Sequence, residues 1–197
     1  MLFVVCDYEL QSPVPELVIA PFDKFRDQHR ESVFLLSRNC TLETRNRTLE
    51  TTMEITVNSI EDLERVTEVL LKYIGEHYNV FLLSGDLGSG KTALTKVLCD
   101  KLEVKELISS PTFSLVNEYQ SPVVGTIYHM DLYRLEKTED LAQIGFEEYL
   151  DSGFLCLIEW PGIAEAYMVM PHIRVNIEVT INNNRIFNIT THDAVDA

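Results

Sequence analysis

The stretch from Gly85 to Thr92, GDLGSGKT, matches the phosphate-binding pattern G-x-x-x-x-G-K-[ST] at every fixed position. Its glycines let the backbone turn tightly and aim N–H groups inward, which makes a concave nest for phosphate oxygens. Lys91 is then placed to reach the β- and γ-phosphates, and the Thr92 hydroxyl to take one position on Mg²⁺. The residues expected to line this nucleotide site are Gly85, Asp86, Leu87, Gly88, Ser89, Gly90, Lys91 and Thr92.

The segments on either side of the loop support this interpretation. Val80 to Leu83 is an uninterrupted apolar run typical of a buried strand, and Ala93 to Leu102 has the pattern of a helix. A helix that begins at the loop adds unpaired amides and partial positive charge toward a phosphate. A glycine-rich turn that arose by chance would not be expected to lie between a buried strand and a helix.

Two carboxylates end later predicted strands. Asp131 follows an apolar strand over Val123 to Met130, and Glu159 follows the apolar run from Phe154 to Ile158. Ligands of open α/β sheets lie at the carboxyl ends of the strands, and an acid in that position is typical of a Walker B element that holds Mg²⁺. The alternative for each is a solvated strand end. Beside a complete phosphate loop, we expect both to belong to the site.

Three weaker candidates remain. The hydroxyl-rich loop at Ser109–Ser114 comes where such proteins often sense the γ-phosphate, although a Ser-Pro-Thr sequence is more often only a turn. Arg185, at a predicted hairpin turn, could reach a nucleotide or could simply be solvated. The histidines show no metal-ligand spacing, and we keep only His129, which precedes Asp131 by two residues.

The remaining patterns predict an α/β fold of the P-loop NTPase type. We expect three layers and a mixed, mainly parallel central sheet that C-terminal antiparallel strands complete. A strand is expected at Glu54–Asn58. A capping signal at Ser59 and Asp62 then predicts a helix, whose buried positions are Ile60, Leu63, Val66, Leu70 and Ile74. Later in the chain we expect a helix from a Thr138 cap to Tyr149 that Gly145 interrupts, and a hairpin of His172–Thr180 and Arg185–Thr190.

Composition limits the partners and the compartment. The formal net charge is −15, which disfavours autonomous binding to nucleic acid because like charges repel. The four cysteines form no C-x-x-C pair, so redox-motif and metal-binding interpretations fail on spacing. The apolar start lacks the basic segment of a secretion signal, and no run reaches the roughly 18 apolar residues of a membrane span. We expect a cytoplasmic protein.

The chain divides into an extension, residues 1–52, and a P-loop ATPase domain, residues 53–197. The extension has short apolar patches without a sustained period, and it carries no chemistry that we can name. We favour Met53 as the functional start, with the preceding residues included by an early start codon. A poorly ordered tail and a small added element are the alternatives.

Four motifs together resemble the TsaE family, also called YjeE, the ATPase component of bacterial tRNA threonylcarbamoyladenosine (t6A) synthesis. They are GDLGSGKT, SPTFSLVNEY, YHMDLYRL and LIEWP, in the order and spacing of that family. The match covers roughly Met53 to Thr190. The phosphate loop is common to many families, whereas H-x-D-L-Y-R followed by E-W-P is far more discriminating.

The resemblance implies a protein that binds ATP and Mg²⁺, hydrolyses ATP weakly alone, and works with TsaD and TsaB. Those partners transfer threonylcarbamoyl to the adenosine beside the anticodon, and ATP hydrolysis resets the complex, so this chain would meet tRNA only indirectly. Carried over by motif, the roles are Lys91 and Thr92 on phosphates and Mg²⁺, Glu159 as a Mg²⁺ ligand, Asp131 in hydrolysis, Thr112 in a switch-like segment, and Tyr133 and Trp160 beside the site.

Two positions depart from the family. Gly162 stands where members commonly carry Glu or Gln after the Trp-Pro pair, which removes a possible nucleotide contact. Met168–Met170 replaces a usual leucine-proline end, a conservative change.

Two other functions are compatible with a phosphate loop. A small-molecule kinase would need an acceptor pocket and usually a lid with arginines, but Arg134 is the only arginine between Ser110 and Thr138. A nucleotide-sensing module would bind without hydrolysis. Lys91, Thr92 and the two acids argue against an inactive site, and Asp131 acting on the attacking water is our best candidate for the base.

Overall fold

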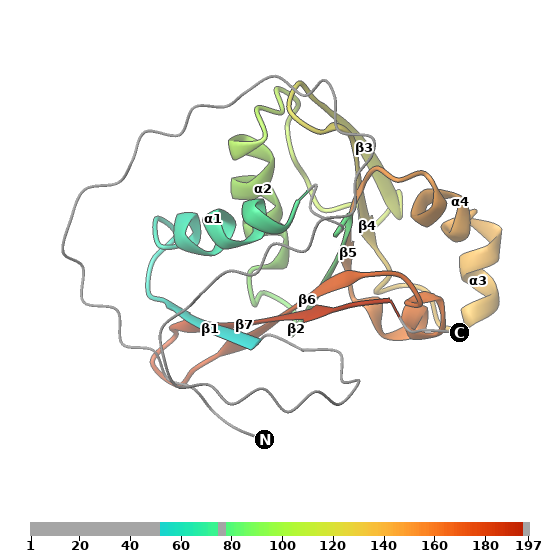
Figure 1. Cartoon of the computed structure of the whole chain (residues 1–197). Coiled ribbons are helices and arrows are strands. Elements are labelled where there is room, and N and C mark those ends of the chain that lie inside the picture. Colours follow the sequence, from blue (N-terminus) through green and yellow to red (C-terminus); the bar gives the residue numbers. More distant parts are fainter. Residues whose placement is uncertain (1–51, 75–77, 195–197) are drawn as a thin grey trace, which may run out of the picture. The chain divides into compact units, whose positions relative to one another are not determined.

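The structure is a computed structural model that describes residues 52–74 and 78–194 (Figure 1). Expectations for residues 1–51 lie outside these ranges, so the division into extension and domain stays a prediction. Within the described ranges no helix is long and apolar enough to cross a bilayer. The elements are β1 (Thr52–Val57), α1 (Leu63–Tyr73), β2 (Val80–Gly85), α2 (Lys91–Lys101), β3 (Val116–Ser121), β4 (Gly125–Asp131), α3 (Thr138–Gln143), α4 (Phe146–Asp151), β5 (Leu155–Glu159), the 3₁₀ helix η1 (Pro161–Tyr167), β6 (His172–Val179) and β7 (Arg185–His192).

The strands form one seven-stranded sheet in the order β1-β7-β6-β2-β5-β4-β3. The four central strands β6, β2, β5 and β4 are mutually parallel, and β7 and β1 extend the sheet with antiparallel pairing. The predicted α/β class and the antiparallel C-terminal hairpin are therefore confirmed. The opposite edge is also antiparallel, because the short turn between β3 and β4 leaves no room for a parallel crossover.

Helices cover both faces of the sheet, which gives the three predicted layers (Figure 1). Alternate residues of β2 show the division, since Phe81 and Leu83 pack with α1 and α2 while Val80 and Leu82 pack with α3, α4 and η1. Both faces of β2 are thus buried, as expected for a central parallel strand. This rigid centre ends at the phosphate loop.

Two predicted helix starts differ from the structure. Ile60 was expected on the buried face of α1 but is 64% exposed, because the helix begins only after Asp62. The Asp62 carboxylate accepts hydrogen bonds from the backbone N–H groups of Asn58 and Ser59, which turns the chain before the helix. At α3 the expected Thr138 cap is wrong. Asp140 Oδ2 instead accepts a hydrogen bond from the backbone N–H of Lys137, which fixes the turn of the chain into α3.

We expect a buried imidazole, that of His172, to make the stability of the domain sensitive to acid. His172 on β6 donates from Nδ1 to the Met170 carbonyl and stacks on His192 of β7, with the ring centres 4.8 Å apart. Burial lowers the pKa of His172, because the charged ring would lose its hydration, and the nearby charge of Arg174 lowers it further.

The folded pKa of His172 lies below the unfolded value of about 6.5, so this stabilisation is complete above that pH and is lost as pH falls below it. We expect the free energy of unfolding in urea to be lower at pH 5.5 than at pH 7.5. The variant His172→Gln should show a smaller difference between the two pH values. An equal difference in both proteins would assign the acid sensitivity to other groups.

Candidate functional site

The phosphate loop joins the carboxyl end of β2 to the start of α2, as predicted. Gly85 and Gly90 have positive φ angles of 141° and 115°, a region that side chains rarely allow. Gly90 directly precedes α2, so the first amides of the helix face the loop. Leu87 at the tip is 80% exposed, whereas Ser89 is buried beneath the loop. The tight glycine turn that the sequence indicates is thus present between β2 and α2.

Gly85 also lacks space for a side chain. A Cβ atom there would lie 2.5 Å from the Ile177 carbonyl oxygen and 2.7 Å from Ser89 Oγ. We expect Gly85→Ala to destabilise the domain by about 1–3 kcal/mol through overpacking and to weaken nucleotide binding. Gly88→Ala is the matched control, since its Cβ would meet nothing within 4 Å and only the backbone conformation would suffer. Equal unfolding free energies for the two variants, measured in urea, would contradict this account.

Lys91 is buried and points back under the loop. Its ammonium donates to the carbonyl oxygens of Gly85 at 2.6 Å and Asp86 at 3.0 Å, and it lies 4.0 Å from the ring centre of Trp160. Burial lowers the pKa of Lys91, although the negative charges of Glu159 and Asp131 oppose this shift. Lys91 is therefore held against the loop by the carbonyl oxygens at its start.

Trp160 follows β5 in a left-handed backbone conformation, with φ of 58°. Its backbone N–H donates to the Leu83 carbonyl, and the centre of its ring lies 4.9 Å from the centre of the Tyr133 ring. A positive φ is rare for a large side chain and indicates that the surroundings hold it there. Trp160 thus lies beside the loop, and Tyr133 packs against Trp160.

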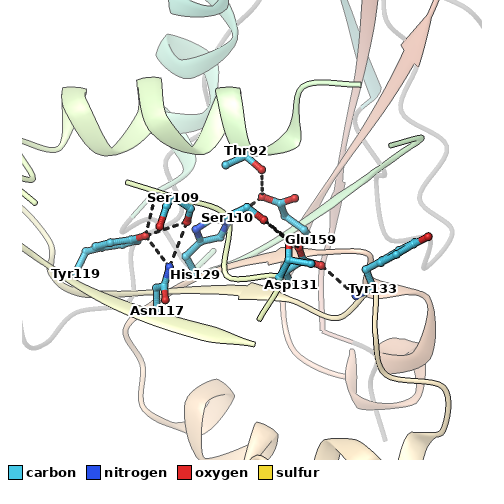
Figure 2. Close-up of polar contacts among 10 residues, drawn as sticks. Thr92, Ser109, Ser110, Asn117, Tyr119, His129, Asp131, Tyr133 and Glu159 are labelled. Carbon is cyan, nitrogen blue, oxygen red and sulfur yellow. Dashed lines mark hydrogen bonds and ion pairs between the residues drawn. The ribbon is translucent and has the colours of Figure 1, made fainter. Parts of the chain in front are cut away.

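The two predicted acids lie side by side. Asp131 and Glu159 are opposite one another in the parallel pairing of β4 with β5, and both are buried. The Thr92 hydroxyl donates to Oε1 of Glu159 at 2.8 Å, which joins the start of α2 to the end of β5 (Figure 2).

The Thr92 hydroxyl and the Glu159 carboxylate are oxygen ligands of the kind that Mg²⁺ prefers. Within residues 52–74 and 78–194, no three or more His, Cys, Asp or Glu side chains form a group that could hold a metal ion. Mg²⁺ usually takes one or two protein oxygens and completes its octahedron with waters and substrate phosphates. Thr92 and Glu159 supply such a pair beside the phosphate loop.

The carboxylate of Asp131 already accepts several hydrogen bonds. Ser110 Oγ donates to Oδ2 at 3.1 Å, and the Tyr133 backbone N–H donates to Oδ1 at 3.1 Å (Figure 2). Thr112 Oγ1 also donates to Oδ2, at 2.8 Å. Asp131 thereby anchors the hydroxyl-rich loop. The sequence made this loop a candidate only by its position in the chain. Ser110 was not among the predicted site residues, and only its Ser-Pro-Thr setting marked it.

Arg185 lies against the outside of the phosphate loop. Its Nε donates to the Ser89 carbonyl at 3.2 Å and its Nη1 to the Asn183 carbonyl at 2.9 Å. The guanidinium thus braces the loop from the β6–β7 hairpin. Gly162, in contrast, is exposed in η1 with nothing within 4 Å of its would-be side chain.

Comparison with known proteins gives a consistent result. The family model described as "Threonylcarbamoyl adenosine biosynthesis protein TsaE" matches residues 57–187. The chain is 39% identical over 141 residues to the tRNA threonylcarbamoyladenosine biosynthesis protein TsaE of Rickettsia conorii, covering 70% of this chain and 77% of the relative. It is 35% identical over 113 residues to the Bacillus subtilis protein of the same name, covering 57% and 69%.

A solved structure supports the fold independently. The crystal structure of YdiB from Bacillus subtilis superposes with a TM-score of 0.60 at 24% identity, covering 74% of this chain and 88% of that one. The likeness to this structure concerns the fold alone, whereas the family match spans the loop, both acids and the aromatic pair. The chain therefore belongs to the TsaE family of threonylcarbamoyl adenosine biosynthesis proteins.

Proposed function

We propose that this chain binds ATP with Mg²⁺ at Gly85–Thr92 and hydrolyses it slowly as a cytoplasmic component of t6A synthesis. It would act with TsaD and TsaB, which modify the adenosine beside the anticodon, and it would meet tRNA only through them. The observation that carries the proposal is the pair of acids at the ends of adjacent parallel strands, beside Lys91 and Thr92. The net charge of −15 agrees with indirect contact to tRNA.

Each residue has a distinct part in this proposal. The loop amides and Lys91 would hold the phosphates and offset the charge that develops on them. The chemistry that Mg²⁺ would supply there is positive charge against the phosphates. Thr92 and Glu159 would hold that ion, and Asp131 would act on the attacking water.

A non-hydrolysing nucleotide sensor is the second candidate, and one contact favours it. The carboxylate oxygens of Asp131 accept hydrogen bonds from the Ser110 and Thr112 hydroxyls and from a backbone N–H in this structure. The loop at Ser110–Thr112 must release Oδ2 before this oxygen accepts a proton from water. For hydrolysis through Oδ2, we expect a slow rate that is limited by movement of this loop.

Trp160 provides the experiment, because it is the only tryptophan in the chain and its ring lies over Lys91. We expect its fluorescence to change in a saturable way on addition of ATP with Mg²⁺ to the full chain. Lys91→Ala should remove the phosphate contact and lower the affinity at least about tenfold. The absence of saturable ATP binding by the unmodified chain would refute the proposal at its first step.

A further inference from the structure

One histidine lies in the core directly beneath the proposed metal site. His129 on β4 is fully buried, and its Nε2 lies 2.9 Å from Oε1 of Glu159 (Figure 2). The same oxygen accepts the Thr92 hydroxyl at 2.8 Å. The other ring nitrogen, Nδ1, is buried without a hydrogen-bond partner in the described residues. The contact with Glu159 is therefore the polar contact that satisfies this ring.

The contacts indicate which ring nitrogen carries the proton. A proton on Nδ1 would leave a buried donor unmet and would put the lone pair of Nε2 against a carboxylate oxygen. A proton on Nε2 leaves only an acceptor unmet and allows the N–H to donate to Glu159. The contacts therefore fit a ring that carries a proton on Nε2.

We propose that His129 is a positioning residue for the Mg²⁺ site, an inference that rests on the proposed function. Its N–H fixes the rotation of the Glu159 carboxylate, so that Oε1 is the oxygen that accepts the hydrogen bond from the Thr92 hydroxyl. The lone pairs of Thr92 Oγ1 and the second carboxylate oxygen, Oε2, then remain available to a metal ion or its water. Groups that orient metal ligands in this way typically change metal affinity about 10- to 100-fold when they are removed.

A purely structural role for His129 explains the contacts less well. Its neighbours on the same face of the sheet are Tyr119, whose ring centre lies 6.3 Å away, and residues of the apolar cluster such as Ile127 and Leu157. In that setting an apolar side chain would fill the space without leaving a ring nitrogen unsatisfied. The imidazole therefore serves Glu159 rather than the packing.

The test compares three variants of the full chain with the unmodified protein. His129→Leu removes the donor, His129→Gln carries an N–H that can reach Glu159, and His129→Asn carries one on a side chain too short to do so. Trp160 fluorescence reports ATP affinity in EDTA and the Mg²⁺ concentration at half-maximal binding. A role confined to folding would not change the Mg²⁺ midpoint of the folded protein.

We expect His129→Leu and His129→Asn to raise the Mg²⁺ midpoint about 10- to 100-fold while ATP affinity in EDTA changes far less. His129→Gln should recover most of the unmodified midpoint. If His129→Leu does not fold, the contrast between the Gln and Asn variants decides. Equal midpoints in all folded variants overturn the positioning role. Failure of the unmodified chain to bind ATP is a different result, which refutes the proposed function instead.

Discussion

Replacing Asp131 by asparagine is expected to lower ATP turnover by about 10²- to 10⁴-fold while nucleotide affinity stays nearly the same. The amide oxygen of the variant still accepts hydrogen bonds from Ser110 and Thr112, so the loop keeps its anchor. The variant loses the ability to take a proton from water, and the Tyr133 N–H loses the acceptor oxygen Oδ1, which an NH2 group replaces. The expected signature is therefore a loss in kcat with little change in KM, measured by phosphate release with the partner proteins present.

The control for this variant is Asp100→Asn, which makes the same chemical change at an exposed position on α2. It should leave turnover unchanged. Turnover of Asp131→Asn at the unmodified rate would remove Asp131 from the chemistry and leave it only the anchoring of the loop.

Phe81→Ala is expected to cause the largest loss of stability, about 3–5 kcal/mol in the free energy of unfolding. Phe81 is completely buried in β2, where its ring packs into the cluster beneath α1 and α2. The truncation leaves a cavity in the strand that ends at the phosphate loop, so nucleotide binding should weaken at temperatures near the lowered Tm.

Phe113→Ala provides the matched control for this truncation. Its ring is 84% exposed and contacts Arg134, whose guanidinium lies 4.2 Å from the ring centre. The loss should stay below about 1 kcal/mol, because exposed contacts of this kind contribute little. Urea unfolding of both variants measures the difference, and similar losses would mean that the cluster around Phe81 relaxes to fill the space.

The sequence was sufficient for the elements that follow one strong pattern. The apolar run before Gly85, the loop itself and the alternating C-terminal hairpin all form where the patterns indicate. Helix starts were less predictable, because the backbone turn that exposes Ile60 depends on a local choice of hydrogen bonds by Asp62. Several side chains compete for such a role, and the pattern of apolar residues does not decide between them.

The site was predictable in its residues but not in its contacts. The pattern places Asp131 and Glu159 at strand ends, yet their pairing requires that β4 lie next to β5 in the sheet. The contact of Arg185 with Ser89 likewise depends on the order β7-β6-β2. His129 was a candidate without a role, because its partner Glu159 lies 30 residues further along the chain.

The most direct test of the proposed function is ATP turnover by the full chain, measured alone and with the cognate TsaB–TsaD pair. We predict slow turnover alone and faster turnover with the pair, with the increase lost in Asp131→Asn. Saturable ATP binding without turnover under either condition would contradict the ATPase proposal and identify the chain as a nucleotide sensor.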